Sequence, residues 1–314
     1  MDDNRNMVDH ESENNDDKNA GIKDQEQEND DLNLQNNKDD KDNDDSKAFP
    51  NRLQAVWLTL LALLIMAVSG LIVGIVLSIF GIDYIGEASS YLAVINALAE
   101  IVAFGGIVLF VMKDRGLDWN YIEGKNVRSI FFYLKLTILM IGLSIVVSEL
   151  DNLIQRFLPM SDTYMELFQN FIDQNFLLVF FSLCIVAPIF EEIFFRGLLL
   201  RGFLKNLEHW TAIFFSAFLF AVIHMNIWQG IGAFFIGVVI GWTFYKTRSL
   251  AVVIFAHFVN NFLALMTAKY ISIPGFSAPS ETGFQPIWFT LAGVVMLITG
   301  ILLIEKRNPG EESI

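Results

Sequence analysis

Side chains that can carry out acid–base chemistry interrupt three apolar stretches of this sequence. The stretches read "FEEIFFR", "FLFAVIHMN" and "FAHFVNNF", and the polar residues concerned are Glu191, Glu192, Arg196, His224, His257 and Asn261. An ionisable group in a bilayer costs about 3 kcal/mol on insertion scales, so each of these residues is a functional hypothesis. Carboxylates and imidazoles activate water, and donors such as carboxamides stabilise oxyanions, so together they suit hydrolysis of a carbonyl group.

The first stretch separates its charges by helical position. Glu192 and Arg196 are spaced i,i+4 with the acid first, which is the favourable order for an ion pair within a helix. Glu191 points roughly 100° away on the same helix and is left without that partner. Pro188 removes the backbone hydrogen bond to the Cys184 carbonyl and is expected to kink or open the helix just before the carboxylates. Glu191 is therefore the carboxylate expected to do chemistry.

The polar groups can meet at a common depth. At about 1.5 Å per helical residue, Glu191 and His224 lie roughly 20 Å and 21 Å from the cytoplasmic ends of their helices. Asn261 lies roughly 17 Å from its own end, and His257 roughly 11 Å. One carboxylate, two imidazoles and one carboxamide on three different helices are therefore predicted to form a single site.

Two kinds of hydrolytic chemistry fit this set. In the first, a water between Glu191 and His224 loses a proton to the carboxylate, and His257 and Asn261 donate hydrogen bonds to the developing oxyanion. In the second, Glu191, His224 and His257 hold a zinc ion with water as the fourth ligand. The zinc alternative lacks the HExxH spacing of many zinc proteases. The residues themselves leave both alternatives open.

The elements that carry these residues are expected to be membrane-spanning helices. Of the 314 residues, 54% are hydrophobic, and they form long blocks. Because backbone groups in lipid must be satisfied within a segment, each block is predicted to be a helix. The fold class is therefore an all-α membrane protein, an eight-transmembrane-helix bundle. The eight blocks are 53–80, 91–112, 129–148, 175–204, 210–225, 229–245, 250–268 and 286–304.

The ends of the chain differ from this bundle. The formal net charge is −14, and most of it lies in residues 1–46, which hold 17 acidic and 5 basic residues. Residues 1–47 contain no aromatic side chain, so they are predicted to be a disordered acidic cytoplasmic tail. The membrane domain is expected at 48–308, and a short cytoplasmic tail at 309–314.

The distribution of Lys and Arg predicts the orientation. Only Arg156 and Lys269 lie in the loops on one side. By the positive-inside rule both termini are then cytoplasmic, in a multi-pass protein of the cell membrane. No basic stripe indicates nucleic-acid binding. The cations of the opposite side are Lys47, Arg52, Lys113, Arg115, Lys125, Arg128, Arg201, Lys205, Lys246, Arg248, Lys306 and Arg307.

Two secondary features bear on packing. The outer loop 149–174 contains "SDTYMELFQNFI", whose apolar residues share one helical face, so an amphipathic interfacial helix is expected there. Thr163 and Glu166 have the spacing of a capping box at its start. The pairs Gly70–Gly74 and Gly237–Gly241 are GxxxG motifs, which favour close packing of helices within the bundle.

The three polar stretches also resemble a known family. "EEIFFR", "FAVIH" and "HFVNN" match, in order, the EExxxR, FxxxH and HxxxN motifs of the CPBP family, over a core of about 170–265. The family comprises CAAX prenyl endopeptidases and bacterial relatives often called Abi or bacteriocin-immunity proteins. The resemblance implies an eight-helix intramembrane protease that opens toward the cytoplasm. The family is commonly labelled metalloprotease, while a metal-free glutamate mechanism is favoured for some members.

The resemblance also implies roles for individual residues. Glu191 and His224 would activate water, and His257 and Asn261 would stabilise the oxyanion. The remaining motif residues, Glu192 and Arg196, would be mainly structural.

The sequence therefore predicts an intramembrane endopeptidase that acts on a membrane-associated protein or peptide. The alternative is a non-proteolytic membrane scaffold or bacteriocin self-immunity protein on the same fold, which would not need all four polar groups. A transporter using Glu191 and the histidines as an ion relay would favour repeated halves, and none is evident. A cysteine protease acting through Cys184, the one cysteine, lacks an activating cation nearby in the sequence.

Overall fold

The computed structural model describes residues 49–80, 91–124, 128–277, 280 and 282–305, and residues 50–314 form one compact unit. Regular structure in the described part is helical, with one isolated β-bridge between Gly124 and Ser249. The acidic tail expected at 1–47 and the short tail expected at 309–314 lie outside the described residues.

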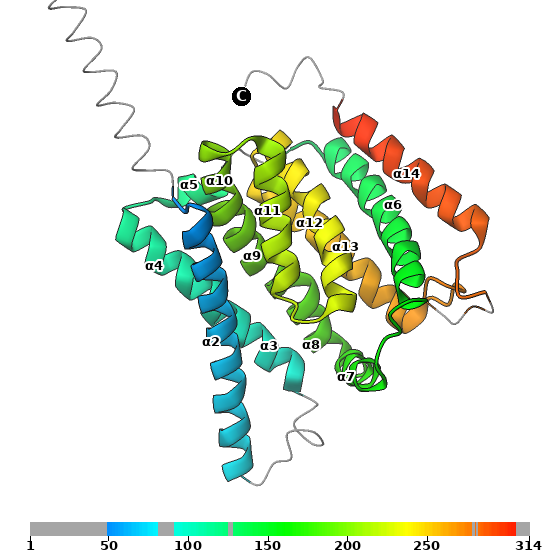
Figure 1. The fold of residues 1–314 in the computed structure, drawn as a ribbon, viewed down its shortest axis with the longest axis horizontal. Helices are drawn as coiled ribbons and strands as arrows, with labels where there is room; N and C mark the ends of the chain where they lie inside the picture. Colours follow the sequence, from blue (N-terminus) through cyan, green and yellow to red (C-terminus); the bar gives the residue numbers. More distant parts are fainter. Residues whose placement is uncertain (1–48, 81–90, 125–127, 278–279, 281, 306–314) are drawn as a thin grey trace, which may run out of the picture. The chain divides into compact units, whose positions relative to one another are not determined.

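The helices follow the apolar blocks of the sequence closely. In chain order they are α2 (Arg52–Ile79), α3 (Leu92–Glu100), η2 (Ile101–Gly105), α4 (Gly106–Arg115), α5 (Trp119–Glu123), α6 (Ile130–Gln155), α7 (Asp162–Ile172), α8 (Phe176–Phe180), η3 (Phe181–Val186), α9 (Ala187–Glu192), η4 (Ile193–Leu200), α10 (Arg201–Asn206), α11 (His209–Val222), α12 (Ile227–Thr247), α13 (Leu250–Tyr270) and α14 (Ile287–Glu305). The three η segments are π-helical and continue their neighbours without a break. Helices α3 to α4 therefore form one rod, and α8 to α10 another (Figure 1).

The chain is a helical membrane protein. In the described part, 7 helical stretches are long and apolar enough to cross a bilayer. Helix α11, which corresponds to the fifth predicted block, has only 14 residues. At about 1.5 Å per residue it is roughly 21 Å long, shorter than the ~30 Å hydrocarbon core. The count of eight spanning helices stays a prediction.

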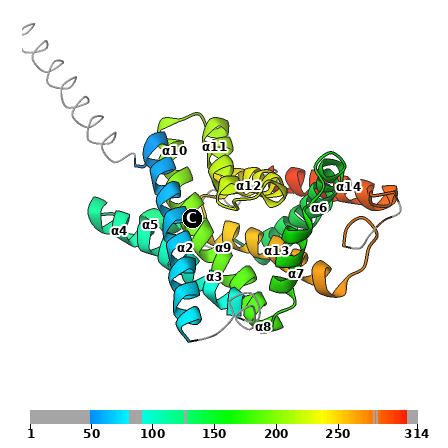
Figure 2. The same cartoon turned by 60° about the horizontal axis from the view of Figure 1, so that its bottom comes forward.

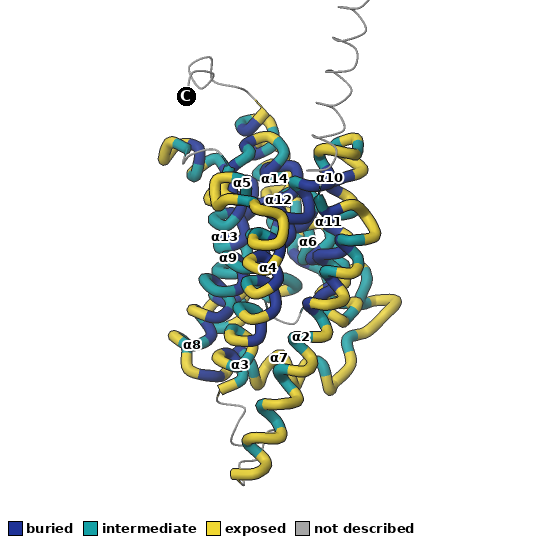
Figure 3. The backbone as a smooth tube through the Cα atoms, turned by 90° about the vertical axis from the view of Figure 1, so that its left-hand side faces the viewer, coloured by how far each residue is buried: buried dark blue, intermediate teal, exposed yellow. Residues whose placement is uncertain are grey.

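Helix α13 occupies the middle of the bundle, where it contacts α6, α9, α12 and η3 (Figure 2). Helices α2 and α14 lie at opposite edges (Figures 1 and 2). Much of α2 is exposed (Figure 3), including apolar side chains such as Leu64 and Leu71. Exposed leucines over a whole helix face suit contact with lipid rather than water.

One end of the bundle collects the cations. The Arg128 guanidinium donates to the Thr247 carbonyl at 3.3 Å, which ties the start of α6 to the end of α12. Arg201 and Lys205 both lie over the Tyr121 ring, with charge-to-centroid distances of 5.5 Å and 5.4 Å. The amphipathic helix α7 lies at the opposite end (Figure 1). This arrangement groups the loops as the positive-inside pattern predicted.

Two packing predictions need correction. A Cβ atom added at Gly70 or Gly74 would meet no described atom within 4 Å, so this GxxxG pair makes no close contact inside the bundle. At Gly237 it would meet Ala217 at 3.2 Å, so the second pair does allow α12 to approach α11 closely. The cap of α7 is Ser161, whose side chain accepts from the Tyr164 N–H, and not Thr163 two residues later.

Candidate active site

The helix that carries the two carboxylates changes register twice. Glu191 and Glu192 end α9, a short α-helical piece between the π segments η3 and η4. Each π segment holds one extra residue per turn, which alters the directions of the side chains beyond it. Segments of this kind are common at functional sites.

The register of η3 determines which carbonyl Pro188 leaves without a donor. The Ala187 N–H bonds to the Ser182 carbonyl, five residues back, so the i+4 donor of Leu183 is used elsewhere. In the π register the next donor for Leu183 would be residue 188, and proline has no N–H. The Asn261 side chain supplies the missing donor, because its Nδ2 donates to the Leu183 oxygen at 2.8 Å. The sequence-based expectation named the Cys184 carbonyl, which is the partner of residue 188 in an α register.

Glu192 is the centre of a buried polar cluster. Its Oε1 accepts from Arg196 Nη1 at 2.9 Å and from His257 Nδ1 at 2.8 Å, and both Glu192 and Arg196 are fully buried. The guanidinium also donates from Nη2 to the Gly237 carbonyl at 3.1 Å and lies 4.7 Å above the Phe220 ring. The ion pair expected from the i,i+4 spacing is present. The sequence did not indicate that Glu192 also holds His257.

His257 is oriented by this contact. Its Nδ1–H is donated to Glu192, so Nε2 is the ring nitrogen that remains for chemistry. The Glu191 Oε2 lies 3.8 Å from that Nε2, which is longer than a hydrogen bond. Both side chains are nearly buried, with 8% of Glu191 and 4% of His257 exposed. His257 is therefore the imidazole in contact with Glu191, whereas the sequence-based scheme paired Glu191 with His224.

His224 lies just beyond α11 and not inside it, because the helix ends at Val222. Its Nδ1 is 2.9 Å from the Phe220 carbonyl, so Nδ1–H donates there and Nε2 is left as the free nitrogen. The Phe220 ring lies edge-on to both imidazoles, with centroid distances of 5.2 Å to His224 and 5.6 Å to His257. Phe220 is thus packed against both histidines.

The backbone around His224 is held in an unusual turn. Met225 has a φ of 54°, a left-handed conformation that non-glycine residues adopt at some cost. Asn226 caps α12 by accepting from the Gln229 N–H at 2.8 Å, and its Nδ2 donates to the His224 carbonyl at 2.8 Å. Asn226 therefore fixes the position of His224. The signal for it in the sequence is an asparagine directly before an apolar run.

Asn261 belongs to a chain of amides that crosses the bundle. Its Oδ1 accepts from Asn260 Nδ2 at 3.1 Å, and the Asn260 Oδ1 accepts from the Ser144 hydroxyl at 3.3 Å. Since a carboxamide has two N–H donors and one is given to Leu183, Asn261 retains one for a ligand. Asn260 was not expected to take part, although the adjacent asparagines in "HFVNNF" were the available signal.

A cavity of about 570 Å³ brings three of the four expected catalytic residues together: His224, His257 and Asn261 line it. Glu191 is not among its lining residues. Its contact with the cavity lining is through His257, whose Nε2 lies 3.8 Å from Glu191 Oε2.

The zinc triad proposed from sequence is not assembled in this arrangement. Within the described residues, no three His, Cys, Asp or Glu side chains are grouped so that they could hold a metal ion. Glu191 is close to His257, but no contact joins either of them to His224 in a shared ligand geometry.

Two further buried side chains, Glu100 and Cys184, can be ionised. Glu100, at the end of α3, lies near enough to Glu191 for their charges to interact, and its Oε2 is buried without a hydrogen-bond partner. Cys184 is 1% exposed in an apolar cluster with Val179 and Leu265, the environment of a small core residue.

Residues 173–263 match the family model described as type II CAAX prenyl endopeptidase Rce1-like. The chain is also 30% identical over 170 residues to the UPF0177 protein YbdI of Lactococcus lactis subsp. lactis (strain IL1403). That alignment covers 51% of this chain and 88% of the relative. The chain belongs to the CPBP family. No solved structure is significantly similar to it.

The CPBP match coincides with the polar site. The matched range 173–263 contains η3, α9, η4 and α11, and also His257 and Asn261 of α13. It excludes α2, α14 and the whole of α6, which form the periphery and one flank of the bundle. The family similarity therefore covers Glu191, His224, His257 and Asn261, whereas α6 and α7, which also line the cavity, lie outside it. It supports a CAAX-type intramembrane protease fold.

Proposed function

We propose that this CPBP-family chain is an intramembrane endopeptidase that hydrolyses a peptide bond of a membrane-associated protein or peptide. The proposal depends mainly on one observation: two imidazoles, each bonded through Nδ1, and one carboxamide line the same cavity beside a nearly buried carboxylate. A scaffold or immunity protein would have no need to orient both rings. Nothing in the geometry favours that alternative.

In the proposed reaction Glu191 and His224 hold the attacking water. Glu191 accepts a proton from it as the oxygen attacks the peptide carbonyl, and the carbon–nitrogen bond then breaks. The proton passes from Glu191 to the leaving amine. Glu191 belongs to α9, and His224 follows α11, so the water has to lie between side chains of two separate segments. A substrate bound in the cavity would complete this arrangement.

The oxyanion would be stabilised by His257 and Asn261. The His257 Nδ1–H is donated to Glu192, and a proton on Nε2 would be donated to the oxyanion. Asn261 offers the N–H that Leu183 does not use. Glu192 acts through His257 and is a positioning residue. The ion pair with Arg196 compensates the negative charge of Glu192 outside the cavity.

The test compares membrane peptides from cells that carry the wild-type chain, Glu191→Gln or His224→Ala. We expect both variants to accumulate the uncut substrate and to be present in the membrane at wild-type level. His209→Ala is the matched control, because His209 begins the same helix that His224 follows and stacks on Tyr245 far from the cavity. Processing by both site variants at the wild-type rate would refute the proposed protease activity.

A further inference from the structure

The central cavity extends from the histidines toward α7. Its walls near His224 and His257 are completed by residues from the ends of four helices that meet at the α7 end of the bundle. These residues are Ser148 and Asp151 of α6, Tyr164, Phe168 and Ile172 of α7, Trp228 and Gln229 of α12, and Thr267 and Ala268 of α13. The cavity therefore runs toward the end opposite the clustered cations.

The short helix α11 explains why the histidine can be reached from this end. The helix starts at the cation-rich end and stops at Val222, after roughly 21 Å, so the turn with His224 lies within the depth of a ~30 Å hydrocarbon core. Helix α7 is held near this recess. Its Tyr164 ring lies 5.3 Å from the Trp228 ring, and Trp228 Nε1 donates to the Leu158 carbonyl at 3.1 Å.

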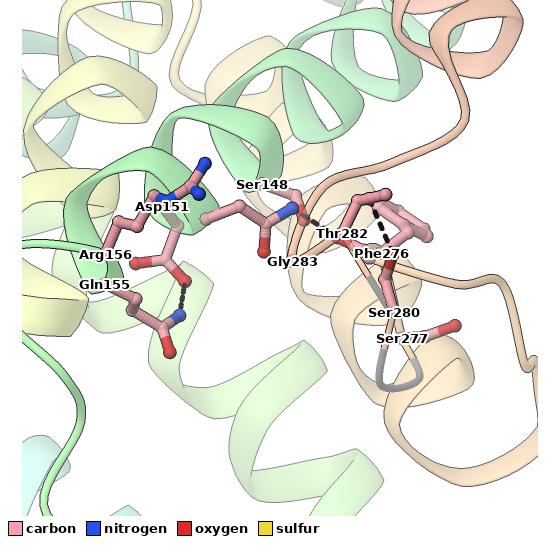
Figure 4. A pocket seen from close by; sticks show the side chains of 11 residues that line it. Ser148, Asp151, Gln155, Arg156, Phe276, Ser277, Ser280, Thr282 and Gly283 are labelled. Atoms are coloured by element: carbon pink, nitrogen blue, oxygen red, sulfur yellow. Dashed lines mark hydrogen bonds between the residues drawn. The ribbon is translucent and has the colours of Figure 1, made fainter.

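A second hollow adjoins the cavity at the same end. It has a volume of about 530 Å³ and shares Ser148, Asp151, Phe276 and Ser277 with the central cavity, so the two lie side by side. Figure 4 shows Asp151 and Gln155 of α6, with Arg156 directly after it, on one side and Phe276, Ser277 and Ser280 on the other. Most of the side chains around it are polar, whereas Phe168, Phe220 and Leu263 line the central cavity.

The α7 end is the end with few cations. The loops that belong to it contain Arg156 and Lys269, whereas the other end gathers Arg52, Arg201, Lys205 and several more. The positive-inside rule therefore places α7 away from the cytoplasm. The family resemblance implied an opening toward the cytoplasm, so the two arguments give opposite directions for this chain.

We propose, on the basis of the function above, that substrates reach the site from the α7 end and that this end faces away from the cytoplasm. The substrate class is a membrane-anchored peptide that presents an extended segment on the non-cytoplasmic side. Apolar residues at the cleavage site occupy the central cavity, and a polar flanking stretch occupies the hollow between Asp151, Arg156 and Ser277.

The test begins with single-cysteine variants labelled by a membrane-impermeant maleimide in sealed right-side-out and inverted vesicles. Gln169→Cys lies on α7 at the cavity, and Lys205→Cys is its exposed counterpart at the other end; both are built on Cys184→Ala. We expect Gln169→Cys to react in right-side-out vesicles and Lys205→Cys in inverted ones. The reverse pattern would overturn the proposed orientation, and neither result depends on proteolysis.

The second measurement uses purified, completely labelled protein and follows cleavage of the membrane peptide that accumulates in Glu191→Gln cells. A bulky adduct at Gln169→Cys should lower the rate about a hundredfold, as misplacement of a substrate does. The adduct at Lys205→Cys should leave the rate unchanged. Unchanged cleavage with the Gln169→Cys adduct would overturn access from the α7 end. If the Glu191→Gln variant still cleaved, that result would instead overturn the proposed protease activity, and the conclusion from the labelling would still hold.

Discussion

The Arg196→Ala variant tests how the buried polar cluster contributes to stability. It removes the hydrogen bonds to Glu192 and Gly237 and leaves a carboxylate that is fully buried. Breaking a buried ion pair in this way costs about 3–5 kcal/mol. Since His257 still donates to Glu192, the lower end, about 3 kcal/mol, is the expected loss. In a domain of this size that corresponds to a fall in Tm on the order of 10 °C.

A double variant separates stability from catalysis. Glu192→Met combined with Arg196→Met removes both charges and keeps most of the volume, so most of the lost Tm should return. His257 then has no acceptor for Nδ1–H, and its ring is no longer oriented. We therefore expect hydrolysis to remain about a hundredfold below wild type.

Both quantities are measured on protein purified in detergent, by following thermal unfolding through tryptophan fluorescence and cleavage of the substrate. A Tm for Arg196→Ala within about 2 °C of wild type would show that Glu192 does not need the guanidinium. Wild-type cleavage by the double variant would show that Glu192 does not position His257. Either outcome contradicts the reasoning from the geometry of this cluster.

Three other outcomes are expected. Asn226→Ala should lower kcat and reduce the free energy of unfolding by only about 1 kcal/mol. Asn51→Ala, which removes the corresponding cap from α2, should reduce the free energy of unfolding by a similar amount and leave kcat unchanged. Equal kcat values for the two variants would argue against a positioning role of Asn226. Asn261→Leu should destabilise the protein by about 1–3 kcal/mol because it leaves the Leu183 carbonyl without a donor, and an unchanged unfolding curve would refute that account. Because the proposed reaction uses the Glu191 carboxylate as the base, purified protein should cleave its substrate after chelation, and activity that only added zinc restores would contradict this proposal.

The helices were predictable because hydrophobic blocks between charged loops carry a strong signal in a membrane protein. Block 250–268 became α13, Leu250–Tyr270, and block 286–304 became α14, Ile287–Glu305. The end of α11 was less predictable. The block continues to residue 225 in composition, but the helix stops at Val222 and Met225 takes a left-handed φ. That turn is favoured by Asn226, which caps the next helix. A helix cap leaves no signal in the hydropathy of the sequence.

The candidate site was predictable only in part. The i,i+4 spacing of Glu192 and Arg196 describes a contact within one helix, which helical geometry alone determines. The contact from Glu192 to His257 joins residues 65 apart, and it depends on how α13 is rotated against α9. Sequence spacing contains no information on that rotation, and the π segments on both sides of α9 change it further.

The proline and the asparagine of the motif region are connected by the same register. A π turn shifts the partner of each carbonyl by one residue, so Pro188 leaves the Leu183 oxygen without a backbone donor. In an apolar environment such a carbonyl must be satisfied from elsewhere, and Asn261 of α13 does so. The irregular helix therefore binds the neighbouring helix that also carries His257. A regular α-helix with a full set of N–H donors would offer α13 no such attachment, so the irregularity helps to bring the two parts of the candidate site together.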